Sequence, residues 1–140
     1  MKTTKIAING FGRIGRLAVR IASSNPLFEI VGINDPFIDP DYAAYMLKYD
    51  TVHGKFDAEI SSDEQNLIIN GNKIRFFNEK EIENINWKST GAEIVLECSG
   101  KFTKLADASK HLTQGAKKVV ISASGKDTPM IIMGVNEEIY

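Results

Sequence analysis

Short apolar runs that end in small or polar residues recur along the chain. They cover residues 5–9, 28–33, 94–97, 119–121 and 130–133. Runs of this kind, without strict alternation of apolar and polar positions, are typical of strands covered on both faces. The pattern therefore predicts an open and mainly parallel sheet.

A helical period follows the first apolar run. The apolar set at positions i, i+3, i+4, i+7 and i+8 is Ile14, Leu17, Ala18, Ile21 and Ala22. The spacing predicts an amphipathic helix that packs onto the sheet through this face. Pro26 ends the helix, because proline cannot donate the next helical hydrogen bond. Strand, helix and strand in this order predict a right-handed crossover unit.

The remaining elements are shorter. Asn70-Gly71 between two apolar runs predicts a β-hairpin over residues 67–76, because both turn positions tolerate positive φ. A second helix is expected after a cap at Asp39 or Asp41. Further helical segments are expected over 79–85 and 105–112, whereas residues 50–63 read as irregular or as short strands.

Composition narrows the class of protein. The length of 140 residues suits one domain. The near balance of 17 Lys and Arg against 18 Asp and Glu argues against nucleic acid or an anionic membrane as a primary partner. A single cysteine forms no internal disulfide, so a reducing, cytoplasmic location is the default expectation.

The most informative motif lies between the first strand and the first helix. Gly10, Gly12 and Gly15 have the spacing G-x-G-x-x-G. Gly10 permits a tight turn off the strand, Gly12 lets backbone approach a pyrophosphate, and Gly15 lets the helix pack close to the strand. The helix N-terminus then offers free N–H groups to phosphates. The plain alternative is a structural strand-to-helix turn.

Asp35 follows the next predicted strand and sharpens the cofactor assignment. A carboxylate at this place accepts hydrogen bonds from both hydroxyls of an adenine ribose, and it repels the 2′-phosphate of NADP. On its own, Asp35 would read as an Asp-Pro turn residue. Together with the glycine loop, it favours NAD as the cofactor.

Four predicted strands end in residues suited to ligand binding. These ends are Asn9-Gly10, Asn34-Asp35, Ser99-Gly100 and Ser122. In an open parallel sheet, ligands bind outside the carboxyl ends of the strands, so we expect the four ends to converge on one crevice. The predicted fold is therefore an α/β, Rossmann-type NAD(P)-binding domain with helices on both faces of the sheet, plus a hairpin insertion.

Five longer segments resemble a known family. They are NGFGRIGR at 9–16, INDPF at 33–37, YDTVHG at 49–54, ECSGKFT at 97–103 and MGVN at 133–136. In this order and spacing they closely resemble the N-terminal part of phosphorylating, NAD-dependent glyceraldehyde-3-phosphate dehydrogenase. The resemblance covers essentially the whole chain. It implies an NAD-binding domain over residues 1–140, with the C-terminal catalytic domain absent from this chain.

The resemblance also implies an activity and a set of cofactor-binding residues. The full-length enzyme of this family is a glycolytic homotetramer that converts glyceraldehyde 3-phosphate and inorganic phosphate to 1,3-bisphosphoglycerate with NAD. By the family pattern, the cofactor-binding residues here are Gly10, Phe11, Gly12, Arg13, Ile14, Asn34, Asp35, Pro36, Lys80, Ser99, Gly100, Phe102 and Ser122. Of these, Asp35 holds the adenine ribose, Lys80 reaches the adenine end and Ser122 lies near the nicotinamide.

Three positions depart from the family pattern. Lys80 stands where the family usually has arginine, which keeps the charge but loses the planar fork. Ser99 replaces a more usual threonine and keeps the hydroxyl. Ser124-Gly125 stands where many members have proline and a small residue, so this loop is expected to be looser.

The chain carries no predicted catalytic or metal-ligating residue. The family's chemistry needs a cysteine nucleophile and a histidine base. Cys98 ends an apolar strand and is expected to be buried and unreactive. His53 is expected to order a loop, Trp87 to anchor packing, and His111 to suit the negative end of a helix dipole. The chain is expected to bind NAD but to be inactive alone.

Other functions remain open at this point. The erythrose-4-phosphate dehydrogenases have the same cofactor half, and the sequence features of this half separate the two enzymes poorly. A non-catalytic NAD-binding or interaction module is a second alternative, since a fold does not fix a function. RNA binding is disfavoured by the balanced charge. In the full-length enzyme the further partners would be a sugar phosphate and inorganic phosphate.

Overall fold

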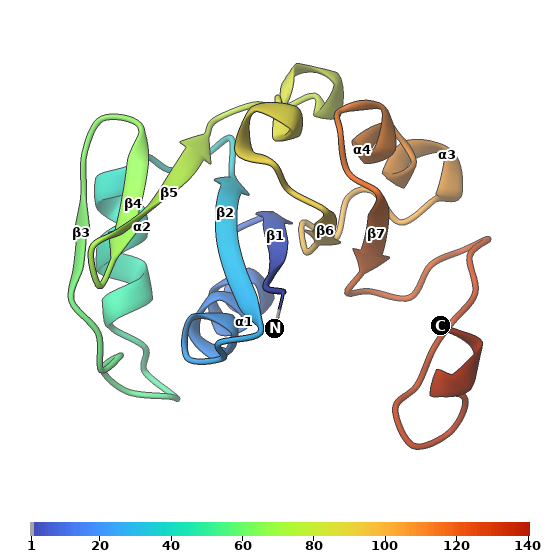
Figure 1. Cartoon of the computed structure of the whole chain (residues 1–140), viewed down its shortest axis with the longest axis horizontal. Helices are drawn as coiled ribbons and strands as arrows, with labels where there is room; N and C mark the ends of the chain where they lie inside the picture. The colour runs from blue at the N-terminus through green and yellow to red at the C-terminus, as the bar shows by residue number, and fades with distance from the viewer. Residues whose placement is uncertain (1) are drawn as a thin grey trace.

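A seven-stranded sheet organises the computed structural model, which describes residues 2–140 (Figure 1). The strands are β1 (Thr4–Asn9), β2 (Phe28–Asn34), β3 (Ile60–Ser62), β4 (Asn66–Ile69), β5 (Asn72–Phe77), β6 (Ile94–Glu97) and β7 (Lys118–Ile121). Their order is β3-β4-β5-β2-β1-β6-β7. The five strands from β5 to β7 pair in parallel, and β3, β4 and β5 pair antiparallel. This confirms the predicted Rossmann-type sheet with a hairpin.

The helices cover the sheet from both sides. They are α1 (Arg13–Ser23), α2 (Pro40–Lys48), α3 (Leu105–Ala108) and α4 (Lys110–Thr113), with single 3₁₀ turns η1 (Ile82–Asn84), η2 (Trp87–Thr90) and η3 (Glu137–Ile139). The carboxylate of Asp39 caps α2 by accepting a hydrogen bond from the Tyr42 amide at 2.8 Å. The segment predicted over 105–112 forms two single turns, and the one over 79–85 shortens to η1.

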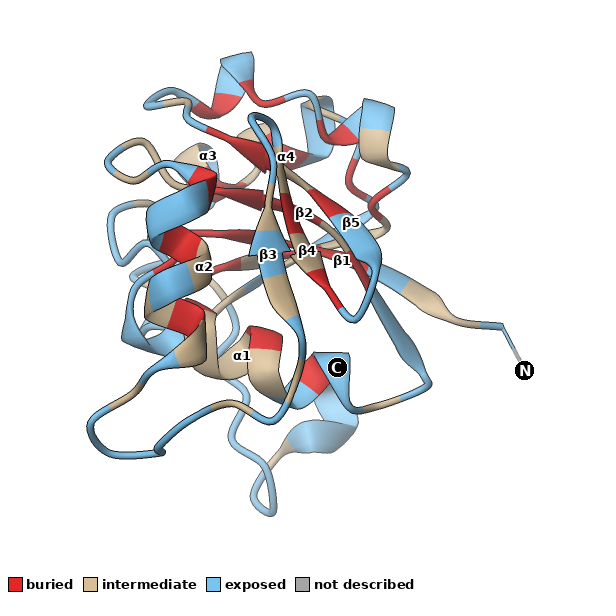
Figure 2. Ribbon diagram, turned by 90° about the vertical axis from the view of Figure 1, so that its left-hand side faces the viewer, coloured by how far each residue is buried: buried red, intermediate tan, exposed pale blue. Residues whose placement is uncertain are grey.

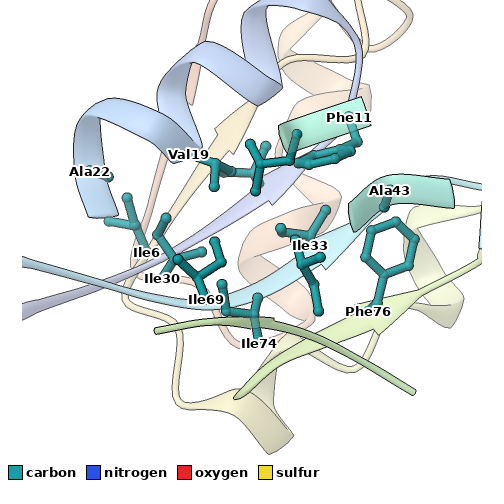
Figure 3. Packing of buried hydrophobic residues seen from close by; sticks show 13 residues of the cluster. Ile6, Phe11, Val19, Ala22, Ile30, Ile33, Ala43, Ile69, Ile74 and Phe76 are labelled. Carbon is teal, nitrogen blue, oxygen red and sulfur yellow. The ribbon is translucent and has the colours of Figure 1, made fainter. Parts of the chain in front are cut away.

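Successive side chains of β1 pack into two different hydrophobic cores, one on each face of the sheet. Ile6 and Ile8 join the core under α1 and α2, which Figure 3 shows with Val19, Ala22 and residues of β2 and β5. Ala7 points to the other face, into a second core that contains the fully buried Trp87. Successive residues of a strand face opposite sides. The central strands are therefore covered on both faces, as their apolar runs predict.

The hairpin forms at the predicted turn. Asn70 has φ of 49° and Gly71 has φ of 82°. Positive φ at both central positions gives the turn the twist that suits the flanking strands β4 and β5. The conformational freedom of Asn70-Gly71 thus explains why the register pairs Ile69 with Asn72.

The face of α1 that meets the sheet differs from the predicted one. Ile14 and Ile21 are 54% and 69% exposed, whereas Gly15, Val19 and Ala22 are buried. A Cβ on Gly15 would overlap the carbonyl oxygen of Gly10. The helix therefore approaches the sheet through a line of small residues, and this close approach turns the larger isoleucines outward.

The predicted strand at 130–133 is also wrong. The segment after β7 contains no strand, and Met130 and Ile132 are each 52% exposed. The Asn136 side chain holds the local turn by accepting from the Ile132 amide at 2.7 Å and donating to the Met130 carbonyl at 2.9 Å. Figure 2 colours this C-terminal segment mostly pale blue, for exposed residues. An apolar run forms a buried strand only where other elements cover it.

None of the helices over residues 2–140 combines the length and the apolar character that a bilayer crossing needs.

Candidate functional site

A cavity of about 370 Å³ lies at the carboxyl ends of β1, β2 and β6. Its place fits the rule that ligands bind outside the carboxyl ends of parallel strands. Eight of the predicted cofactor-binding residues line it: Gly10, Gly12, Asn34, Asp35, Pro36, Lys80, Ser99 and Phe102. The structure therefore brings together residues that lie far apart in the sequence.

The glycine loop forms one wall of the cavity. Gly10 has φ of 98°, and a Cβ there would lie 2.6 Å from the Ser99 Cα. Only glycine lets the loop after β1 approach the loop after β6 this closely. By contrast, a Cβ on Gly12 would meet nothing within 4 Å. The packing inside the chain gives no reason for glycine at position 12, so the open space beside it fits a group that comes from outside the chain.

The start of α1 is suited to an anion. Gly12 supplies no side-chain cap, and the first turn contains no acidic residue. The first N–H groups of a helix lack partners within the helix and carry partial positive charge. These groups face no competing side-chain acceptor in the first turn, so a phosphate is a suitable partner for them.

Asp35 is held in one orientation by backbone amides. Its Oδ2 accepts from the Phe11 amide at 3.0 Å, and its Oδ1 accepts from the Phe37 amide at 2.9 Å. Each carboxylate oxygen retains capacity for a further donor. Within residues 2–140, no lysine, arginine or histidine forms an ion pair with Asp35. The Asp35 carboxylate therefore suits a ligand that offers hydroxyl donors. A ligand with a phosphate group at this place would be repelled by the negative charge of Asp35.

Similarity to a known protein family shows to which family the chain belongs. The family described as "Glyceraldehyde 3-phosphate dehydrogenase, NAD binding domain" matches residues 4–105. The chain belongs to this family. Its match begins at β1, contains the glycine loop and Asp35, and ends just beyond Phe102.

Curated relatives carry the same family name. The chain is 55% identical to glyceraldehyde-3-phosphate dehydrogenase of Claviceps purpurea (strain 20.1) over 136 residues, which is 97% of this chain and 40% of the relative. It is 56% identical to that of Phytophthora infestans over 135 residues, covering 96% and 41%, and 54% identical to that of Colletotrichum lindemuthianum over 140 residues, covering 100% and 42%. The chain thus spans about two fifths of the length of these relatives.

Five predicted cofactor-binding residues of this NAD-binding domain lie outside the cavity lining. They are Phe11, Arg13, Ile14, Gly100 and Ser122. The Phe11 ring is buried against Phe76, and only its backbone amide reaches Asp35. Arg13 pairs with Asp50 at 2.9 Å. Ser122 lines a separate groove of about 560 Å³ beside β7, so the four strand ends do not converge on a single cavity.

The cysteine environment disfavours a thiolate. Burial raises the pKa of the Cys98 thiol above its ordinary value, a hydrogen bond with Ser122 acts against this, and the Glu97 carboxylate raises the pKa further. A nucleophilic cysteine needs the opposite, an environment that lowers its pKa. Cys98 is only partly buried and lines the cavity, unlike the buried thiol that was expected, and its lack of reactivity stays a prediction.

His111 lies in the last turn of α4, as expected, but its side chain is fully buried, which the sequence did not indicate. Its Nδ1 accepts from the indole N–H of Trp87 at 2.9 Å. Its Nε2 lies 2.6 Å from the buried carboxylate of Glu97. The fully buried Trp87 confirms the expected packing role, and it also supplies a hydrogen bond that the sequence did not suggest.

The sequence reasoning missed a row of polar side chains behind the cavity. The parallel register places Asn9 level with Asn34 on one side and with Glu97 on the other. All three side chains are at least 97% buried. The signal in the sequence was that each of three apolar runs ends in a polar residue. The register that aligns these three residues could not be read from the sequence.

Proposed function

We propose that the cavity at the ends of β1, β2 and β6 holds the adenosine and pyrophosphate parts of NAD. The observation that carries the proposal is the pairing of open space at Gly12 with an oriented Asp35 that has no cationic partner. A pyrophosphate suits the first, and the ribose hydroxyls suit the second. Membership of the NAD-binding family supports the same cofactor.

Each part of the site has a proposed role. The backbone from Gly10 to Ile14 binds the pyrophosphate, and Asp35 binds the adenine ribose. The adenine lies beside Asn34, Pro36 and Lys80, while Ser99 and Phe102 wall the adenosine pocket. Gly100, which lies outside the cavity lining, is proposed to contribute to the same wall from the loop between them. Ser122 lies toward the nicotinamide, which would extend from the cavity along the sheet edge toward β7.

The proposed activity belongs to a longer enzyme. Residues 1–140 form its NAD-binding domain, and a catalytic domain elsewhere supplies the cysteine and histidine. NAD supplies a hydride acceptor when bound. The substrates of the whole enzyme are glyceraldehyde 3-phosphate and inorganic phosphate, it acts in the cytoplasm, and it assembles as a homotetramer. The names of the relatives support the dehydrogenase activity in this proposal.

The proposal is tested by calorimetric titration of the 140-residue chain with NAD. Asp35→Ala removes the charged acceptor of the ribose hydroxyls, and a hydrogen bond to a charged group contributes ~1.5–3 kcal/mol. The dissociation constant should therefore rise about tenfold or more. Asp39→Ala is the matched control, because it removes a nearby carboxylate that only caps α2. Absence of NAD binding by the folded chain, or equal affinity of the Asp35→Ala variant, would contradict the proposal.

A second experiment tests the inactivity of the chain alone. The 140-residue chain should not oxidise glyceraldehyde 3-phosphate in the presence of NAD and phosphate, because burial raises the pKa of the Cys98 thiol and so disfavours the nucleophilic thiolate. Turnover that disappears in the Cys98→Ser variant would overturn this assignment and make Cys98 a nucleophile.

A further inference from the structure

The Glu97 carboxylate is 1% exposed and lies beside the residues that line the cavity. Its Oε2 accepts from the Asn9 side-chain amide at 2.7 Å and lies 2.6 Å from His111 Nε2. Its Oε1 accepts from the Ser99 amide at 3.0 Å and from the Ser99 hydroxyl. Four donors therefore surround one buried carboxylate.

The protonation of His111 follows from its neighbour Trp87. An indole N–H can only donate, so His111 Nδ1 must accept. The ring hydrogen then lies on Nε2 and points at Glu97. A neutral His111 leaves the carboxylate without a cationic partner, and two donors on each of its oxygens match the ionised form of Glu97. Within residues 2–140, no buried side-chain polar atom lacks a partner.

Such an arrangement is costly to fold. A buried carboxylate that has no opposite charge loses its hydration, and hydrogen bonds replace only part of it. Strand pairing does not require it, because backbone hydrogen bonds already join β1 to β2 and β1 to β6. Holding the sheet together therefore does not explain why a carboxylate is buried at position 97.

Glu97 sets the direction of a row of amides. A carboxylate only accepts, so Asn9 must turn its NH₂ toward Glu97 and its oxygen away. That oxygen accepts from the Asn34 amide at 2.8 Å. Asn34 in turn accepts from the Glu79 amide and donates to the Glu79 carbonyl, both at 2.9 Å. The buried charge thus orients Asn9 from one end of the row, and the Glu79 backbone orients Asn34 from the other end.

The side chains that Glu97 connects form part of the cavity wall. Asn9, Asn34, Glu79 and Ser99 all line the cavity, and Glu97 connects them without lining it. His111 and Trp87 lie at the other end of the same network and do not line the cavity. The network therefore has one arm at the cavity and one arm away from it.

We propose that Glu97 is a positioning residue of the cofactor site. Its carboxylate orients Ser99 and Asn9 directly, and both residues line the cavity, so the adenosine pocket is ordered before the cofactor arrives. This inference rests on the proposed function, in which the same cavity binds NAD.

The decisive variant is Glu97→Gln, which keeps the size of the side chain and replaces one acceptor oxygen by an NH₂ donor. Either Asn9 and His111 or the Ser99 donors then face another donor, so Asn9 or Ser99 loses a hydrogen bond that holds it in place at the cavity. We expect the dissociation constant for NAD to rise about tenfold or more, because charge-assisted hydrogen bonds are the stronger ones.

Trp87→Phe is the matched control. It removes a buried hydrogen bond from the arm that points away from the cavity, so it should lower the melting temperature while the dissociation constant for NAD stays within about twofold of the wild-type value. Titrations are made at a temperature at which circular dichroism shows each variant to be folded. A purely structural role of Glu97 predicts that both variants lose stability and neither loses affinity.

NMR spectra of the chain without NAD provide a second measurement. The side-chain NH₂ resonances of Asn9 and Asn34 should move in Glu97→Gln and stay in place in Trp87→Phe. If Glu97→Gln does not fold, Asn9→Ala interrupts the same row one step further along, and it should also raise the dissociation constant.

The outcomes separate the two proposals. Wild-type chain that does not bind NAD contradicts the proposed function. Wild-type chain that binds NAD, together with folded Glu97→Gln or Asn9→Ala of equal affinity, overturns the positioning role alone.

Discussion

Two parts, or flanks, of the same sheet edge, one at the ends of β1, β2 and β6 and the other beside β7, differ in the contacts that order them. Between β1, β2 and β6, the cavity walls are fixed by close glycine contacts and by the buried network around Glu97. Beside β7, the chain from 122 to 140 contains no strand, and its apolar side chains are exposed (Figure 2). The first flank is ordered by polar contacts that the chain supplies itself.

The two flanks need different partners for their side chains. At the first flank, the buried side-chain polar atoms all have hydrogen-bond partners inside residues 2–140. At the second flank, Met133 is 81% exposed, and the neighbouring backbone is held by the Asn136 side chain and by local turn hydrogen bonds to the Ile132 carbonyl. Burial of such a segment needs another apolar surface.

The largest expected effect comes from Gly15→Ala. The added Cβ would overlap the Gly10 carbonyl, so α1 must move away from the glycine loop. Overpacking of this kind costs ~1–3 kcal/mol. We expect that loss in the free energy of unfolding, measured by urea denaturation, together with weaker NAD binding. Wild-type stability of this variant would show that the close packing of α1 is not needed.

Gly12→Ala should separate binding from folding. Its Cβ meets nothing within 4 Å, so the free energy of unfolding should change by no more than ~0.5 kcal/mol. The methyl group occupies the space proposed for the pyrophosphate, so the calorimetric dissociation constant for NAD should rise about tenfold or more. A variant that binds NAD like the wild-type chain would place the pyrophosphate elsewhere.

A smaller effect concerns the loop that contacts the start of α1. Amide hydrogen bonds from His53 and Val52, helped by Arg13, lower the pKa of Asp50 to about 2. A carboxyl whose pKa is lowered in the folded chain adds stability above its unfolded pKa of ~3.9 and loses that contribution as the pH falls toward 2. The melting temperature of Asp50→Asn should therefore fall less than that of the wild-type chain between pH 4 and pH 2. Parallel curves would exclude this contribution.

The smallest effect is expected at the other flank. Met133→Ser replaces an exposed side chain, so the free energy of unfolding should change by less than ~0.5 kcal/mol and NAD affinity should stay the same. A clear loss of stability in urea denaturation would mean that 130–133 packs against the sheet, as the strand predicted there would do.

Local rules predicted the parts of the fold that depend on local chemistry. The turn at Asn70-Gly71, the cap at Asp39 and the central strand runs follow from conformational preference and from burial on both faces. The exposed Ile21 and the buried His111 could not be predicted in this way, because their surroundings come from distant segments. The same holds for the candidate site. The motif located Gly12 and Asp35, whereas Glu97 emerged only from the strand register.

The most direct test is an NMR titration of the ¹⁵N-labelled chain with NAD. We expect saturable shifts of the backbone amides of Gly12, Asp35 and Ser99, which lie around the cavity, and unchanged amides over residues 60–69 of β3 and β4, which do not line it. Addition of NADP at the same concentrations should produce much smaller shifts, because its 2′-phosphate would face Asp35. Shifts confined to residues 130–140, or equal responses to NAD and NADP, would contradict the account.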